Sequence, residues 1–286
     1  MSILLLFMTL FAFANSQRYD LYDEVKNSRN FTGKVALVTG SATGIGAEII
    51  QLYSALGASV VVTGRKADDV HKTALIVQQL SPKHLKPLEI TADLTKSDEL
   101  ENLLTETIKT YSKIDILVNN AGIYQKGNIT DPKFLETLDR SIAIDIRANL
   151  QLIHLSVPYL QKTKGTVINL SDVQINRPQK DYLGYQIAKS SADMATQVLA
   201  IELGILGIRV NAVSPGIIES HPLDQGLYNK TVSHTPLGRV GQSADIAKAV
   251  IFLSSTDASF ITGHNLVVDG GLKYGLDSQF LSDLNL

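Results

Sequence analysis

The sequence of 286 residues contains no cysteine. Disulfide frameworks, thiolate zinc sites, iron–sulfur clusters and cysteine nucleophiles are therefore excluded. The sequence also lacks an apolar run of the roughly 18 residues that a membrane-spanning helix needs. This absence excludes a polytopic membrane protein and predicts that no segment spans a membrane.

An excess of charge of one sign is absent as well. The 26 Lys and Arg side chains nearly balance the 28 Asp and Glu side chains, and 44% of the residues are apolar. This composition is typical of a folded globular protein. Nucleic-acid-binding proteins usually carry excess positive charge, and disordered chains contain few apolar residues. We therefore expect a folded protein that binds no nucleic acid.

Histidine is scarce and scattered. The six histidines show no metal-ligand spacing, so the sequence predicts no metal site and a surface or packing role for each of them. They are His71, His84, His154, His221, His234 and His264.

The N-terminal segment Ile3–Ala14 differs from the rest of the chain because its residues are apolar or nearly so. The segment is too short to span a bilayer comfortably, and its length suits the core of a signal peptide. Small residues, Ala14 and Ser16, precede a cleavage site before Gln17. We therefore expect a signal peptide over 1–16 and an N-terminal arm over 17–32. This interpretation places the protein in the secretory pathway, in the ER lumen or secreted; an ER-membrane anchor and a cytoplasmic chain are the alternatives.

From Lys34 onward, short apolar runs alternate with longer amphipathic segments such as Ser97–Tyr111 and Gly184–Leu203. Continuous apolar runs are typical of strands buried on both faces, and the alternation indicates a parallel sheet between two layers of helices. We therefore predict an α/β fold in which 33–286 form one doubly wound domain with a seven-stranded parallel sheet. The expected strands are Val35–Thr39, Val60–Thr63, Leu88–Ile90, Ile114–Val118, Thr166–Leu170, Arg209–Val213 and Leu266–Val268.

A glycine-rich loop follows the first expected strand and opens a helix over Ile45–Leu56. Glycines at 40, 44 and 46 allow a tight turn and a close approach of backbone N–H groups to a pyrophosphate, and the helix N-terminus favours its negative charge. This strand–loop–helix context predicts a dinucleotide-binding site. The loop reads Thr39-Gly40-Ser41-Ala42-Thr43-Gly44-Ile45-Gly46.

The TGxxxGxG spacing of this loop, together with a second motif at 119–122, resembles the short-chain dehydrogenase/reductase family. The resemblance covers nearly the whole chain after residue 33. The further motifs that carry it are Asn119-Asn120-Ala121-Gly122, Asp93, Tyr185-x-x-x-Lys189, Pro215-Gly216, Ile261-Thr262-Gly263 and Val268-Asp269-Gly270-Gly271.

The resemblance implies a Rossmann domain and an enzyme that transfers hydride between a nicotinamide cofactor and a small-molecule substrate. It also implies a homotetramer or homodimer, and a flap over the substrate at Glu219–Gly238. The cofactor-binding residues that it implies are Gly40, Ser41, Thr43, Gly44, Ile45, Gly46, Arg65, Asp93, Asn120, Ala121, Gly122, Tyr185, Lys189, Pro215, Gly216 and Ile218.

The choice of cofactor depends on the end of the second expected strand. An acidic residue there binds the ribose hydroxyls of NAD and repels the 2′-phosphate of NADP. This sequence has Gly64 at that position and Arg65 next to it, while Thr43 stands at the family's other common basic position. A guanidinium suits a phosphate, so we expect NADP(H) in preference to NAD(H).

Tyr185 and Lys189 lie four residues apart on an expected helix and therefore share one of its faces. An ammonium near a phenol lowers the phenol pKa from about 10. Tyr185 would give a proton to a substrate oxygen as hydride arrives, or remove one in the reverse direction. The resemblance implies that Lys189 also holds the nicotinamide ribose.

Two residues depart from the family pattern. Asp172 stands where the resemblance implies a catalytic serine, next to Ser171, and Asp145 stands where it implies an asparagine. The implied catalytic residues are thus Asp145, Asp172, Tyr185 and Lys189. An ionised carboxylate accepts hydrogen bonds but donates none, and its charge raises the pKa of a nearby tyrosine. We expect a site that is poorer at oxidising alcohols and better suited to reducing substrates that carry N–H groups.

These departures leave three interpretations open. The first is a carbonyl/alcohol oxidoreductase. The second is a pteridine-type reductase, because an aspartate at position 172 is similar to the pteridine reductases of the family. The third is a dinucleotide-binding protein with weak or no catalysis. Asp145 either pairs with Lys189 or marks, together with Asp172, a weakened site.

Overall fold

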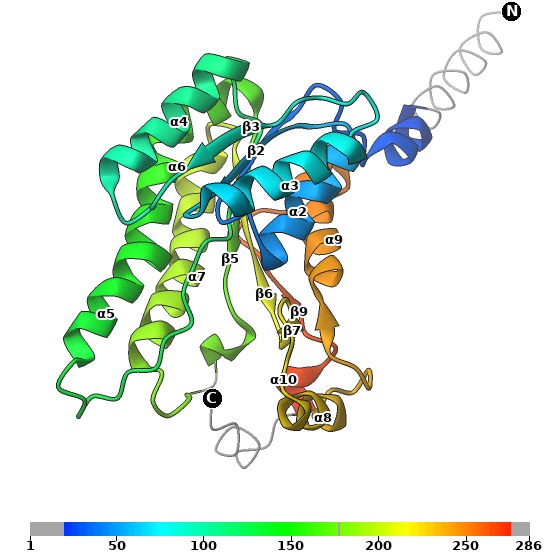
Figure 1. Ribbon diagram of the computed structural model, residues 1–286. Coiled ribbons are helices and arrows are strands. Elements are labelled where there is room, and N and C mark those ends of the chain that lie inside the picture. The colour runs from blue at the N-terminus through cyan, green and yellow to red at the C-terminus, as the bar shows by residue number, and fades with distance from the viewer. Residues whose placement is uncertain (1–19, 177, 276–286) are drawn as a thin grey trace, which may run out of the picture.

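The computed structural model describes residues 20–176 and 178–275. A seven-stranded parallel sheet forms its middle layer, and helices cover both faces (Figure 1). The strand order is β3-β2-β1-β4-β5-β6-β9, so the order reverses between β1 and β4. The predicted doubly wound sheet is confirmed. The expected signal peptide over 1–16 lies outside the described residues.

Each predicted strand of the large sheet is present to within two residues at either end. Those strands are β1 (Val35–Val38), β2 (Ser59–Gly64), β3 (Leu88–Thr91), β4 (Ile116–Asn119), β5 (Thr166–Leu170), β6 (Arg209–Pro215) and β9 (Asn265–Val268). Every residue of β1, β4 and β5 is buried, because helices cover both faces of the sheet there. The sequence analysis missed a parallel pair of two-residue strands, β7 (Ile218–Glu219) and β8 (Gly241–Gln242), which are too short to leave a periodic pattern.

The helices alternate with the strands. They are α2 (Gly44–Ala55), α3 (Ala67–Leu80), α4 (Ser97–Tyr111), α5 (Phe134–Ile142), α6 (Ala148–Thr163), α7 (Leu183–Gly204), α8 (Gln225–His234), α9 (Ser243–Ser254) and α10 (Leu272–Gly275). A π-helical turn (Ala143–Arg147) joins α5 to α6, and a 3₁₀ turn (Val173–Asn176) follows β5. Within the described residues, no helix is both long and apolar enough to cross a membrane.

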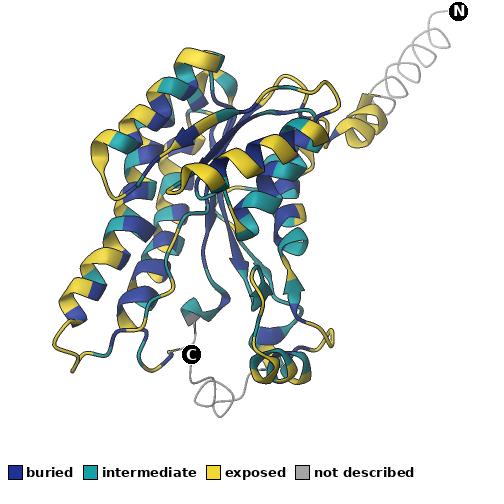
Figure 2. Ribbon diagram, in the orientation of Figure 1, coloured by how far each residue is buried: buried dark blue, intermediate teal, exposed yellow. Residues whose placement is uncertain are grey.

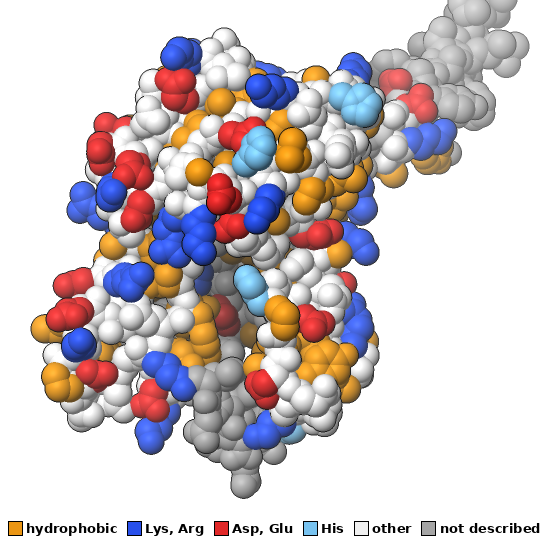
Figure 3. Space-filling model, viewed as in Figure 1, with side chains coloured by type: hydrophobic (Ala, Val, Ile, Leu, Met, Phe, Trp, Pro, Cys, Tyr) orange, Lys and Arg blue, Asp and Glu red, His pale blue; other side chains and the backbone are white. Residues whose placement is uncertain are grey.

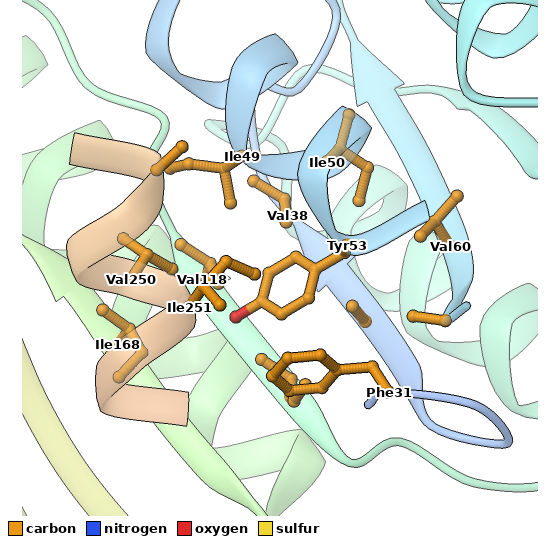
Figure 4. Close-up of a cluster of buried hydrophobic side chains, with 14 of the residues drawn as sticks. Phe31, Val38, Ile49, Ile50, Tyr53, Val60, Val118, Ile168, Val250 and Ile251 are labelled. Carbon is orange, nitrogen blue, oxygen red and sulfur yellow. The ribbon is translucent and has the colours of Figure 1, made fainter. Parts of the chain in front are cut away.

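The first core cluster lies between the sheet and the helices α2, α3 and α9 (Figure 4). Tyr53 of α2 is fully buried at its centre and meets Phe31 edge to face, with ring centroids 5.3 Å apart. Its hydroxyl donates a 2.8 Å hydrogen bond to Ser254 Oγ of α9. Phe31, which the sequence analysis assigned to the arm, is therefore part of the core. The cluster fixes α2, whose N-terminus borders the glycine loop.

The second core cluster covers the opposite face of the sheet and packs α4, α6 and α7 against it. It includes the fully buried Leu37, Leu103, Leu117 and Leu152. Burying one such side chain contributes about 1.5–3 kcal/mol. In Figure 2 the central strands of the sheet are buried, and the outer sides of the helices are exposed. The two clusters hold the carboxyl ends of the strands at one edge, where ligands bind in open α/β sheets.

Candidate cofactor cleft and active site

A cleft of about 870 Å³ opens at the carboxyl ends of β1, β2 and β4. In Figure 3 the face of the molecule is hollowed, with Lys and Arg side chains beside the hollow. Of the implied cofactor residues, those that line the cleft are Gly40, Thr43, Gly44, Ile45, Gly46, Arg65, Asn120, Ala121 and Gly122.

The glycine loop has the backbone geometry that its sequence predicts. Gly40 and Gly44 have φ of +64° and +59°, in the left-handed region that favours glycine. A side chain at Gly46 would collide with the Gly40 carbonyl and with Asn120. Within the described residues, the N-cap residue Thr43 makes no side-chain hydrogen bond to α2. The first N–H groups of α2 therefore remain available to a phosphate, and this cradle fits the diphosphate of a dinucleotide.

The segment Asn119–Gly122 holds the glycine loop in place. Thr39 Oγ1 accepts hydrogen bonds from the backbone N–H groups of Asn120 and Ala121, at 2.9 and 3.0 Å. The Asn120 side chain donates to the Thr39 carbonyl at 2.8 Å. A Cβ at Gly122 would collide with the Asp145 carboxylate and lie 3.2 Å from Lys189 Nζ. This short segment therefore connects the candidate cofactor cleft to Asp145 and Lys189.

The end of β2 leaves no room for the acidic residue of an NAD site. A Cβ built on Gly64 would lie 2.7 Å from the Cβ of Ala42. Ala42 is itself tied to α3, because its carbonyl accepts a 2.9 Å hydrogen bond from Thr73 Oγ1. Arg65 and Lys66 follow Gly64, and both are exposed and line the cleft. The described structure thus places two cations here.

Asp93 does not line the cleft, although its neighbours Ala92 and Leu94 do. Hydrogen bonds from Thr95 hold the pKa of Asp93 below its ordinary value, and the positive charge of Arg65 is a weaker cause. Ser41 does not line the cleft either. It is fully buried, and its Oγ accepts a 2.9 Å hydrogen bond from the backbone N–H of Thr63.

Four ionisable side chains meet in the buried part of the site. Tyr185 and Lys189 of α7 are 6% and 7% exposed. Tyr185 Oη donates a 2.5 Å hydrogen bond to Asp172 Oδ2, at the end of β5. Lys189 Nζ lies 3.1 Å from Asp145 Oδ1 and donates to the Leu170 carbonyl at 3.1 Å. The structure therefore brings the implied catalytic residues together, and the pairing of Asp145 with Lys189 is present.

Burial and negative charge set the protonation of this group. Burial, followed by the charge of Asp172 and its hydrogen bond, raises the pKa of Tyr185 well above its ordinary value. Burial also raises the pKa of Asp172 and of Asp145, against the influence of Lys189. The sequence analysis weighed Lys189 against the carboxylates; burial is the largest cause of the shift, and the carboxylates act in the same direction. Both causes favour the protonated form of Tyr185.

Two aromatic side chains, Tyr124 and Tyr182, lie beside Tyr185. The Tyr124 ring stacks on Tyr182, with centroids 4.5 Å apart, and meets the edge of Tyr185 at 4.8 Å. Tyr182 is buried, whereas Tyr124 is 47% exposed. The sequence analysis missed both side chains. Tyr182 lies three residues before Tyr185, which was the available signal, but Tyr124 is distant in sequence and its position required the fold.

The implied residues after β6 lie away from the cleft. Gly216 packs against Asp269, since a Cβ there would lie 2.8 Å from the Asp269 Cβ. Ile218 lines a second cavity of about 560 Å³ instead, and Pro215 ends β6. The next residues, Ser220 and His221, do line the main cleft. His221 is exposed, as a surface role predicts, but the sequence analysis did not place it at the cleft.

Comparison with known proteins agrees with this geometry. A family model described as enoyl-(acyl carrier protein) reductase matches residues 40–273. Glucose 1-dehydrogenase of Gluconobacter oxydans is 36% identical over 257 residues, which cover 86% of this chain and 94% of that protein.

Two solved structures are similar over most of their length. A short-chain dehydrogenase/reductase of unknown function from Caenorhabditis elegans, solved with cofactor, gives a TM-score of 0.80 at 31% identity and covers 88% of this chain and 99% of that one. A 7α-hydroxysteroid dehydrogenase complexed with NADH and 7-oxo glycochenodeoxycholic acid gives 0.81 at 31% identity, covering 86% and 96%. The chain belongs to the short-chain dehydrogenase/reductase family of oxidoreductases.

Proposed function

We propose that this protein is an NADP(H)-dependent reductase of small-molecule carbonyl compounds. The observation that carries the proposal is the part-buried hydrogen bond from Tyr185 to Asp172 beside the buried Lys189–Asp145 pair. A nicotinamide bound in the cleft would supply the hydride. Tyr185 gives the proton of its Oη to the substrate oxygen, and Lys189 holds the nicotinamide ribose, as the family resemblance implies.

The protonation of Tyr185 favours the reductive direction. Reduction needs a phenol that has a proton to give, and burial and Asp172 raise the pKa of Tyr185 so that it keeps that proton. Alcohol oxidation needs the phenolate, which the same two causes disfavour. The charge of Asp172 contributes to this shift only while Asp172 is ionised, whereas burial acts in either state. When Asp172 is protonated, it can donate a hydrogen bond to the substrate oxygen, as the resemblance implies for the family's serine hydroxyl. Burial favours that form, because it raises the pKa of Asp172.

The proposed preference for NADP(H) rests on charge at the end of β2. Gly64 offers no carboxylate to the ribose hydroxyls, and Ala42 occupies the space that such a side chain needs. Arg65 and Lys66 are exposed at the cleft. Guanidinium and ammonium groups both bind phosphates, and the guanidinium does so through two parallel hydrogen bonds.

The experiment measures NADPH and NADH consumption by residues 17–286 against ketones, aldehydes, quinones and dihydropteridines. Turnover of a carbonyl compound with preference for NADPH supports the proposal. Turnover with NADH alone contradicts the cofactor preference. Tight NADPH binding without turnover favours the third interpretation, a dinucleotide-binding protein with weak or no catalysis. The variant Asp172→Ser then tests that interpretation. Strong carbonyl reduction by this variant would mean that Asp172 impairs the native site.

A second candidate function is reduction of a pteridine-like substrate. When Asp172 and Asp145 are both ionised, the single ammonium of Lys189 leaves one negative charge unbalanced in the buried group. An ionised Asp172 accepts hydrogen bonds and therefore suits a substrate that presents N–H groups. Dihydropteridine turnover that exceeds carbonyl turnover in the same panel would favour this candidate.

We also propose a homo-oligomer, either a homotetramer or a homodimer. Met194, Val198 and Ile201 on α7 are 58%, 44% and 77% exposed, and Ile205, directly after the helix, is 88% exposed. Apolar patches of this kind mark protein interfaces. Light scattering on the purified protein measures the state. A monomer at micromolar concentration contradicts the proposal.

The proposed location is the secretory pathway, in the ER lumen or outside the cell, and it rests on the apolar segment Ile3–Ala14. N-terminal sequencing of the native protein tests it. A mature chain that begins near Gln17 supports the proposal, and a chain that keeps residues 1–16 contradicts it.

A further inference from the structure

The loop after β7 runs beside the cofactor cleft, next to the N-terminus of α2. Ser220 and His221 of this loop line the cleft together with Thr43, Gly44 and Ile45. A Cβ built on Gly44 would lie 3.5 Å from both His221 Cε1 and Ser220 Cβ. The imidazole therefore borders the part of the cleft that the amides of α2 also border.

Hydrogen bonds on both sides of His221 position the loop. Before it, β7 pairs with β8, and Gln242 Nε2 donates to Glu219 Oε2 at 3.1 Å. After it, the Asp224 carboxylate accepts a 3.0 Å hydrogen bond from the backbone N–H of Leu227 and caps α8. His221 is exposed between these two anchors. The loop thus presents the imidazole from a defined backbone position.

The ring nitrogens of His221 differ in their surroundings. Nδ1 lies 3.2 Å from Ser220 Oγ. Among the described residues, no hydrogen bond involves Nε2, so this nitrogen can donate to a ligand in the cleft. Because a histidine side chain is neutral or positively charged near neutral pH, a phosphate oxygen is a suitable acceptor.

The other charged side chains that line the cleft lie elsewhere along it. Arg65, Lys66 and Asp69 lie at the end of β2 and on α3, where the proposed function places the 2′-phosphate. Among the described residues that line the cleft, His221 is the ionisable side chain that borders the glycine loop. Two phosphate groups of the cofactor would therefore meet different parts of the protein.

We propose that His221 is a ligand of the cofactor diphosphate, opposite the N-terminus of α2. The proposal rests on the proposed function only in requiring that a dinucleotide binds in the cleft. Both NADPH and NADH carry the diphosphate, so His221 contributes equally to both cofactors. Arg65, in contrast, contributes to the binding of NADPH alone.

The experiment measures dissociation constants for NADPH and NADH from the fluorescence of the reduced nicotinamide. The proteins are the wild type, His221→Gln, His221→Lys and Arg65→Ala, with His264→Gln as the control because His264 is exposed and does not line the cleft. Adenosine 2′-monophosphate, which carries the 2′-phosphate and no diphosphate, is a third ligand, titrated by calorimetry. Thermal unfolding verifies that each variant folds.

The expected result is a weakening of about fivefold or more in His221→Gln, by the same factor for NADPH and NADH, as for one charge-assisted hydrogen bond. The affinity for adenosine 2′-monophosphate stays unchanged in this variant and falls in Arg65→Ala. His221→Lys retains affinity for both dinucleotides because its ammonium can donate to the same phosphate.

Three results overturn the proposal: unchanged affinities in His221→Gln, a loss confined to NADPH, or an equal loss for adenosine 2′-monophosphate. A wild type that binds NADH as tightly as NADPH contradicts only the cofactor preference. A wild type that binds neither dinucleotide overturns both proposals.

Discussion

The candidate site has two halves: a cofactor half around the glycine loop, and a catalytic half around Tyr185 and Lys189. Different chemical groups form the two halves. The cofactor half consists mainly of backbone: two glycines with positive φ, the open N-terminus of α2 and the hydrogen bonds of Thr39. The catalytic half consists of buried ionisable side chains, whose behaviour depends on their charges and burial. Backbone geometry of this kind suits the diphosphate that dinucleotides share, whereas the proposed reaction depends on the charged group. Variants should therefore affect binding and chemistry separately.

The largest expected effect belongs to the catalytic half. Tyr185→Phe removes the proton donor, so we expect carbonyl reduction to fall about 100-fold or more, the contribution typical of a general acid. The dissociation constant of NADPH should change little. Steady-state kinetics and fluorescence titration measure the two quantities. Unchanged turnover would contradict the assigned role of Tyr185, and a parallel loss of binding would break the separation between the halves.

The pH dependence of reduction sharpens the role of Asp172. Burial raises the pKa of this carboxyl, so its neutral, hydrogen-bond-donating form persists to higher pH than in an ordinary aspartate. We expect kcat/KM for a carbonyl substrate to fall as pH rises through that pKa, because the ionised form only accepts. Asp172→Asn has no such ionisation and should lose this decrease.

Asp139→Asn is the matched control for the pH profile, because Asp139 is exposed on α5. Its profile should follow that of the wild type. A decrease that persists in Asp172→Asn would assign it to another group. Activity that instead rises with pH in the wild type would favour a substrate that donates N–H groups to the carboxylate.

In the cofactor half, Arg65→Ala tests the preference for NADPH. We expect affinity for NADPH to fall about five- to tenfold at low salt, since an exposed charge-assisted contact is worth less than a buried one. Affinity for NADH and the maximal rate with saturating NADPH should stay the same. Lys72→Ala, on the exposed side of α3 and away from the cleft, is the control. An equal loss for both cofactors would show that Arg65 does not distinguish them.

The smallest expected effect concerns the core beneath both halves. Tyr53→Phe removes the hydrogen bond to Ser254 and keeps the ring packed on Phe31. We expect the free energy of unfolding to fall by about 1 kcal/mol in urea titrations. Cofactor binding should be nearly unchanged, because the hydroxyl lies in the core between α2 and α9 rather than in the cleft. A large loss of NADPH binding would show that this contact positions the glycine loop.

The sequence analysis correctly predicted the elements that depend on a local pattern of residues. The strands were recognisable because each is a short apolar run, and the glycine loop because Gly40, Gly44 and Gly46 stand between a strand and a helix. The resemblance to the family also identified Asp145 and Asp172 as departures from its pattern.

Other features depend on tertiary placement and could not be read from the sequence. Tyr124 contacts Tyr185 from a loop distant in sequence. His221 gains a position at the cleft only because β7 and β8 pair, and those strands are two residues long. The direction of the Tyr185 pKa shift depends on burial, which outweighs a nearby ammonium.

The π-helical turn between α5 and α6 has a consequence for how this chain tolerates length changes. Asp145 lies within that wide turn and points at Lys189 from it. Successive residues of an α-helix are rotated by about 100°, so deleting a single residue from the turn would swing the carboxylate to another side of the helix while leaving every catalytic side chain in the sequence. Which residue pairs with Lys189 therefore depends on the number of residues in this turn. A homologous chain with an ordinary α-helical turn here would need its carboxylate at a different position in the sequence to face the same lysine.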